Sequence, residues 1–242
     1  MRGRSQQADA ARIGVLSPLS ASETTSAPFE AFRKALRDLG YIEGKRINFI
    51  YRWADGDHER LAELAADLAS SNVDVIFCAP GTPTAIAARN ATTVIPIVFA
   101  GAGDVVATGL VESLARPAGN ATGLVNESQD LAGKQLELLI EAVPTVSQVG
   151  VFWRPSNPSY KNLLSRFDAV VRATGVKVVL IDVERRAELE PAFETMKKAE
   201  SMVCLCKPTT YSSMKAHASS SWPQCTDYLQ STGSGTKQQR AG

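Results

Sequence analysis

The amino-acid sequence predicts an α/β protein built from open parallel sheets of the doubly wound, Rossmann-like class. Its apolar runs are short and continuous rather than alternating, which is typical of parallel strands covered on both faces. Between these runs, apolar residues recur at the three- and four-residue steps of amphipathic helices. The two patterns alternate at a spacing of about 25–30 residues, as strands joined by right-handed helical crossovers require.

The elements follow one another in a regular order. Phe29, Phe32, Leu36 and Leu39 form the first helical pattern, and Gly40 follows it as a stop signal. Further helices are predicted over 61–68, 85–89 and 131–143. The predicted strands are 13–16, 47–51, 73–78, 95–100, 149–153 and 176–181.

These elements form two series, which predict two lobes at 11–125 and 126–212. Residues 1–10 resemble the remnant of a leader, and the stretch 116–126, rich in Gly, Pro and Asn, is predicted to connect the lobes. Two such lobes would form a cleft between the carboxyl ends of two sheets, where ligands bind in this class of fold.

Composition excludes several classes of protein. The 242 residues include 26 Lys+Arg and 25 Asp+Glu, and a net charge of +1 argues against a nucleic-acid partner. No apolar run approaches the roughly 20 residues that span a bilayer. The basic start has no apolar stretch after it, so the chain as written has no export signal and would stay in the cytoplasm.

Motifs for cofactors and metals are also missing from the sequence. Cys204 and Cys206 are separated by one residue, which does not match a zinc-binding spacing. No Gly-rich dinucleotide fingerprint follows the first strand. We therefore expect neither a metal nor a cofactor.

The loop after strand 73–78 carries the first candidate binding residues. Thr82 is predicted to cap the next helix, with Pro83 at its first position. The N–H groups near Gly81, Thr82 and Thr84 would then bind a carboxylate. The alternative is an ordinary helix start that contacts no ligand.

The loop after strand 95–100 carries the second candidate. Gly103 allows the backbone to approach a ligand closely, and Asp104 can accept a hydrogen bond from an ammonium group of that ligand. Equally, Asp104 could cap a helix at 108–115.

Other loops supply further candidates. Asn157 follows strand 149–153, where a second helix start is predicted to face the first and to contribute from the second lobe. Ser17 and Asn126 are candidates at the mouth of the predicted cleft.

Linked motifs resemble those of a known family. They are LGYIEGK at 39–45, YRWA at 51–54, IPIVFA at 95–100 with Gly103-Asp104, GLV and SLARP within 109–117, NATG at 120–123 and AGK at 132–134. Over roughly residues 11 to 211, the chain resembles ABC-transporter substrate-binding proteins of the tryptophan/tyrosine-binding type. One departure is Val105, where family members often have Pro after Gly-Asp.

The resemblance implies a type I periplasmic binding protein fold that closes on a small solute, such as an amino acid, aromatic ones included. It implies a membrane permease and a separate ATPase as partners, an extracytoplasmic location, and binding without catalysis.

The last residues depart from this pattern. From about 213 to 242 the sequence is polar and has no period, so we expect a tail foreign to the family. Codon junctions in this stretch permit a family-like helix and strand in another frame, which suggests a frameshift near 213. An incomplete second lobe would expose the sheet edge after 202–206 and weaken or abolish solute binding.

Two other classes of function would need features that the sequence lacks. A ligand-sensing regulatory domain of the same fold would need a DNA-binding element, for which the N-terminus has no room. An α/β enzyme would need a nucleophile and base that none of the loops supplies.

Overall fold

The structure, a computed structural model, describes residues 10–22, 27–126, 131–160, 164–198 and 202–206. The chain divides into two compact units. Unit 1 comprises Met1–Leu131 and Ser156–Leu164, and unit 2 comprises Ala132–Pro155 and Ser165–Gly242. The predicted lobe boundaries stay a prediction. The tail at 213–242, with the suggested frameshift, and almost all of the leader remnant lie outside the described residues.

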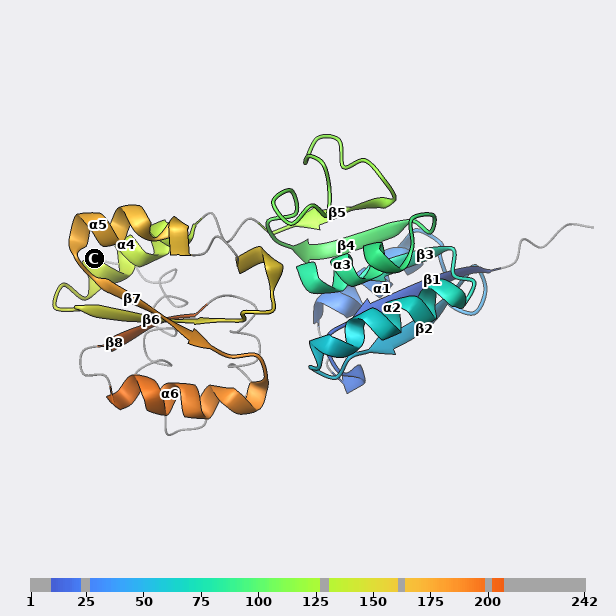
Figure 1. The fold of residues 1–242 in the computed structure, drawn as a ribbon. Coiled ribbons are helices and arrows are strands. Elements are labelled where there is room, and N and C mark those ends of the chain that lie inside the picture. The colour runs from blue at the N-terminus through green and yellow to red at the C-terminus, as the bar shows by residue number, and fades with distance from the viewer. Residues whose placement is uncertain (1–9, 23–26, 127–130, 161–163, 199–201, 207–242) are drawn as a thin grey trace, which may run out of the picture. The chain divides into compact units, whose positions relative to one another are not determined.

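Unit 1 is a five-stranded parallel sheet in the order β2-β1-β3-β4-β5. Helix α1 covers one face, and α2 and α3 cover the other (Figure 1). The strands are β1 Ala11–Ser17, β2 Ile47–Trp53, β3 Val75–Cys78, β4 Ile97–Ala102 and β5 Ala121–Val125. The helices are α1 Ala27–Asp38, α2 Leu61–Ser70 and α3 Thr82–Ala91, with the 3-10 helices η2 His58–Arg60 and η3 Pro158–Tyr160.

Two apolar layers hold this sheet. On the side of α2 and α3, Leu16, Ile76 and Phe99 are buried. On the side of α1, the Phe32 and Phe77 rings stack with centroids 4.4 Å apart. Both faces are thus packed, which explains why the strand sequences are continuous apolar runs.

Unit 2 is a three-stranded parallel sheet in the order β7-β6-β8. Helix α6 packs on one face through residues such as Leu189 and Met196, and α4 and α5 lie on the other (Figure 1). The strands are β6 Gln148–Trp153, β7 Lys177–Asp182 and β8 Met202–Cys206. The helices are α4 Ala132–Ala142, α5 Asp168–Thr174 and α6 Leu189–Lys198, with the 3-10 helices η4 Leu164–Arg166 and η5 Arg186–Glu188.

The predicted doubly wound α/β class is confirmed, because both sheets are parallel and both carry helices on two faces. All six predicted strands are present. Two of them start two residues later than predicted, at Val75 and Ile97. For β4 the reason is Pro96, which has no N–H for the ladder; Ile97 donates instead to the Asn120 carbonyl at 2.8 Å.

Two predictions between β4 and α4 are wrong. The predicted connector 116–126 contains β5, a short strand whose apolar signal is weak. The predicted helix at 108–115 is a series of turns. Its apolar residues Leu110 and Val111 are buried against the core of unit 1 without a helix, which explains the misleading pattern.

Within the described residues, no helix combines the length and the apolar character needed to cross a bilayer.

Candidate functional site

The carboxyl edge of the unit 1 sheet gathers the candidate residues. Ser17 ends β1, the segment 81–84 follows β3, and Gly103 and Asp104 follow β4. Asn126 follows β5 and donates its backbone N–H to the Ala102 carbonyl at 2.7 Å. Since all five strands are parallel, these ends meet at one edge, the usual ligand edge of such sheets.

The N-cap of helix α3 lies one residue before the predicted N-cap, Thr82. Its N-cap is Gly81, whose φ of +97° lies in the region that favours glycine, rather than Thr82. Thr82 and Pro83 are therefore the first and second helical residues. Because Pro83 has no N–H, the first turn offers the N–H groups of Thr82 and Thr84 to an anion.

The hydroxyl of Thr82 is not free to cap the helix because it lies in a buried polar cluster. Thr82 Oγ1 donates to the Gly103 carbonyl at 2.9 Å and accepts the Gly103 N–H at 2.8 Å. Ser159 Oγ lies 2.7 Å from Thr82 Oγ1 and 3.0 Å from the Gly103 oxygen. Thr82 and Ser159 are each 2% exposed, so these groups satisfy one another away from water.

Asn157 holds the turn that carries Ser159. Its Oδ1 accepts the Ser159 N–H at 3.1 Å, and its carbonyl accepts the Tyr160 N–H at 3.0 Å. This turn is the 3-10 helix η3, so a helix does start at the predicted place, and its described residues form a 3-10 helix. The Asn-Pro-Ser sequence signals such a turn, but sequence reasoning missed Ser159, whose partner Thr82 is 77 residues away.

Asp104 sits in a backbone conformation that is uncommon for residues other than glycine, with a φ of +51°. Its carbonyl accepts the Thr108 N–H at 2.9 Å and so begins the turns after β4. No helix follows among the described residues 104–120, so the alternative role of Asp104 as a helix cap is wrong. Its side chain is partly exposed at the edge.

The remaining hydroxyls of the edge support local backbone. Ser17 Oγ accepts the Leu19 N–H at 3.2 Å, and Thr84 Oγ1 donates to the Pro80 carbonyl at 3.1 Å. Both residues are buried. They shape the loops rather than present hydroxyl groups to solvent.

Cys78, at the end of β3, is a free buried cysteine. Burial raises the pKa of its thiol to about 12. At neutral pH the thiol therefore stays protonated, which is the wrong state for a nucleophile.

A separate cavity of about 330 Å³ lies beside the first residue of β5, Ala121. Its wall includes Arg89, which donates a hydrogen bond to the Gly109 carbonyl, and Glu112. None of the candidate residues of the carboxyl edge lines it.

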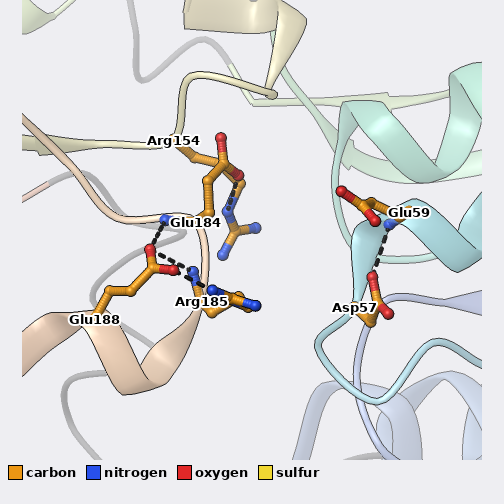
Figure 2. A network of polar contacts seen from close by, with 6 residues as sticks. All are labelled: Asp57, Glu59, Arg154, Glu184, Arg185 and Glu188. Atoms are coloured by element: carbon orange, nitrogen blue, oxygen red, sulfur yellow. Dashed lines mark hydrogen bonds and ion pairs between the residues drawn. The ribbon is translucent and has the colours of Figure 1, made fainter.

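The carboxyl edge of the unit 2 sheet carries charged residues. Arg154 follows β6 and pairs with Glu184, which follows β7 (Figure 2). Glu188 accepts the backbone N–H groups of Glu184 and Arg185 at 2.8 and 3.2 Å and the Arg185 Nε–H at 3.0 Å. These hydrogen bonds, those from the backbone foremost, lower the pKa of Glu188. Sequence reasoning missed this network, because a charged loop is also typical of an ordinary solvated surface.

Among the described residues, no group of three or more His, Cys, Asp or Glu side chains could hold a metal ion. The expectation that the protein uses no metal stays a prediction.

Comparisons with known proteins agree on one family. A sequence model described as "ABC transporter substrate binding protein" matches residues 12–219. The chain is 30% identical over 167 residues to a tyrosine-binding protein of Clostridioides difficile (strain R20291), covering 69% of the chain and 48% of that protein. The chain thus spans about half the length of this curated relative.

Two solved structures extend the comparison. A conserved domain protein from Vibrio cholerae has a TM-score of 0.69 at 28% identity, covering 78% of this chain and 63% of that one. A domain from Streptococcus pneumonia in complex with L-Trp has a TM-score of 0.71 at 23% identity, covering 85% and 68%. The second likeness shows the fold alone.

Proposed function

Because the chain belongs to the ABC transporter substrate-binding protein family, as its motifs predicted, we propose that it is the solute-binding component of an import system. The family consists of solute-binding proteins rather than enzymes and is normally extracytoplasmic. The solute we propose is an amino acid, aromatic ones included, and the curated tyrosine-binding relative supports this class. The predicted cleft between lobes stays part of this proposal.

The observation that carries the proposal is the convergence of polar groups at the carboxyl edge of unit 1. Asp104 provides a partly exposed carboxylate that suits an ammonium group. The first turn of α3 provides two N–H groups, on Thr82 and Thr84, that suit a carboxylate. An amino acid carries both of these groups on one carbon.

Ser17, Gly81, Gly103, Asn126 and Asn157 complete the proposed site mainly through the backbone they position. The turn held by Asn157 keeps Ser159 against Thr82, and so fixes the loop that Gly103 and Asp104 share. A preorganised loop of this kind lowers the ordering cost of binding a solute.

Binding of this kind needs no covalent chemistry, and we propose that the chain catalyses none. The protonated, buried Cys78 supports this. We propose a membrane permease with its ATPase as partners, a location outside the cytoplasm, and neither cofactor nor nucleic acid. Impaired binding through an incomplete second lobe also stays a proposal.

Calorimetric titration of the full chain with amino acids, tyrosine and tryptophan first, tests the proposal. We expect Asp104→Asn to bind the ammonium at least about tenfold more weakly, since one charge-assisted hydrogen bond is lost. The matched control is Asp38→Asn, an exposed carboxylate that pairs with Lys34 on α1.

Equal binding by Asp104→Asn and the unmodified chain would remove Asp104 from the site. Absence of heat with every amino acid would contradict the amino-acid assignment, or support the predicted impairment if a longer family-like version of the chain does bind.

A further inference from the structure

The cavity of about 330 Å³ in unit 1 lies away from the proposed site. Its wall includes Ala121, the first residue of β5. Because the strands of this sheet are parallel, the start of β5 belongs to the amino edge, opposite the carboxyl edge that holds Thr82 and Asp104. The volume lies within the range of small-molecule pockets, about 300–1,000 Å³. The cavity is therefore large enough to hold a solute of its own.

An ordered loop forms most of the wall of this cavity. The described residues 103–120, between β4 and β5, contain turns but no helix (Figure 1). Leu110 and Val111 are buried and fix the loop to the core of unit 1, and the Glu112 N–H donates to the Pro117 carbonyl at 3.0 Å. Connections of this length without secondary structure are uncommon in compact domains, and the ordered ones usually serve a function. The wall is thus held in place before a ligand arrives.

Two opposite charges line the cavity without neutralising each other. Arg89, in the last turn of α3, donates one guanidinium N–H to the Gly109 carbonyl. Within the described part of the chain, the other N–H groups of this guanidinium and the Glu112 carboxylate have no hydrogen bond or ion pair. Both side chains are exposed, so a ligand can reach both from solvent.

The rest of the lining supplies an acceptor and an apolar surface. Asn120 donates its side-chain amide N–H groups to the Thr92 and Ile95 carbonyls at 3.0 and 2.8 Å. These two bonds fix the side chain, and no described residue donates to its oxygen, which stays an acceptor. Val106 and Pro117 add apolar surface to the wall.

This combination of charges selects a zwitterion. A carboxylate without a cationic group is attracted by Arg89 and repelled by Glu112, and an amine without a carboxylate meets the reverse. A molecule that carries both groups can direct its carboxylate to the guanidinium and its ammonium to Glu112 and the Asn120 oxygen. With the apolar surface, the lining fits an amino acid that has an aliphatic side chain.

We propose that this cavity is a second solute site, which binds a small zwitterion with an apolar body through Arg89 and Glu112. The inference does not rest on the proposed function, because the cavity shares no residue with the carboxyl-edge site.

An NMR titration of the full chain tests the inference. The backbone amides of Gly109 and Gly119 report on the cavity, and that of Gly103 reports on the carboxyl edge. The probes are L-leucine, 4-methylpentanoate, which is leucine without its amino group, and 3-methylbutylamine, which is leucine without its carboxyl group. We expect L-leucine to give saturable shifts at Gly109 and Gly119. Each half-molecule should bind there at least about tenfold more weakly, since one charge-assisted contact is lost.

Variants of the two charged residues separate a direct contact from a damaged loop. Arg89→Gln and Glu112→Gln should each weaken leucine binding at least about tenfold. At the same time, 4-methylpentanoate should bind Glu112→Gln more tightly than the parent, and 3-methylbutylamine should bind Arg89→Gln more tightly, because a repulsion is removed. A damaged loop would weaken all three probes.

Two features keep this test sharp. Arg116→Gln removes an exposed arginine of the same loop that does not line the cavity, and it should bind leucine as the parent does. Glu112 has no side-chain partner among the described residues, so Glu112→Gln tests the site even if loss of the Arg89–Gly109 contact unfolds Arg89→Gln.

The outcomes separate this inference from the proposed function. If leucine shifts Gly103 but neither Gly109 nor Gly119, the cavity site is overturned and the proposed function stands. If leucine shifts Gly109 and Gly119 and no amino acid shifts Gly103, the cavity site stands and the carboxyl-edge assignment fails. If 4-methylpentanoate binds the cavity as tightly as leucine, Glu112 has no role there and the zwitterion assignment is overturned.

Discussion

The loops at the carboxyl edges of the two sheets are held by different kinds of contact. At the edge of unit 1, neutral hydroxyl and peptide groups of Thr82, Gly103 and Ser159 are buried and bonded to one another. At the edge of unit 2, Arg154, Glu184 and Glu188 keep part of their surface in water. Both edges lie at the carboxyl ends of parallel strands, so the difference comes from the side chains and not from the topology.

This difference follows from the cost of burial. A neutral hydroxyl can be removed from water if every donor and acceptor finds a partner, whereas a buried charge has a far larger penalty. Unit 1 can therefore fix its loops inside the protein, and unit 2 must fix its loop at the surface. We expect substitutions in unit 1 to change stability strongly and those in unit 2 to change mainly charge and pH response.

The largest effect should come from Gly123→Ala, in the strand beneath the unit 1 edge. A methyl group at Gly123 would overlap the carbonyl oxygen of Phe99 on β4, and backbone cannot move aside as a flexible side chain can. Because Gly103 directly follows β4, the substitution should loosen the buried cluster. We expect a loss of about 3 kcal/mol in the free energy of unfolding, measured by urea denaturation.

Thr122→Ala is the matched control, since Thr122 is an exposed neighbour on the same strand. It should cost less than about 1 kcal/mol. Equal losses of unfolding free energy for the two variants would show that the close contact with Phe99 does not cause the loss at position 123.

The next effect concerns the buried cluster itself. Thr82→Val keeps the shape of the side chain but leaves the Gly103 N–H without its partner. We expect a loss of about 2 kcal/mol in unfolding free energy, since an unsatisfied buried group costs roughly 1–3 kcal/mol. Hydrogen exchange of the Gly103 amide should also become faster.

Two variants calibrate this value. Ser159→Ala removes one hydroxyl but leaves both Thr82–Gly103 contacts, so it should cost about half as much. Thr195→Val, on the exposed face of α6, should be nearly neutral. Unchanged exchange of the Gly103 amide in Thr82→Val would contradict the hydrogen bond between them.

The contrast between the two edges also explains what the sequence could predict. Continuous apolar runs located six of the strands, because burial on both faces leaves a direct trace in the sequence. The loops after two of these strands supplied the candidate residues 81–84 and 103–104. The strand β5 was missed because its sequence, ATGLV, has a weak apolar signal and its close contact, that of Gly123 with the Phe99 backbone, joins residues far apart in sequence. Ser159 escaped for the same reason, since its partner Thr82 lies far away in sequence. Spacing rules describe local periodicity, and neither contact is local.

The smallest effect is expected at the unit 2 edge and tests whether its loop is held by charge. The backbone N–H groups of Glu184 and Arg185, with the Arg185 side chain, bind the ionised form of Glu188 and lower its pKa below the ordinary value of a glutamate carboxyl. A group whose pKa is lower in the folded state stabilises the fold above its unfolded pKa, and this contribution is lost as the pH falls through the folded value.

Hydrogen exchange of the Glu184 and Arg185 amides should therefore become less protected only in this acid range, after correction for the intrinsic pH dependence of exchange. In Glu188→Gln the acid-range change should disappear, because the amide does not titrate. A carboxyl titration of Glu188 by NMR with a midpoint at or above the ordinary value would show that packing holds the loop. The two edges would then not differ in the way argued, because charge would not hold the unit 2 loop.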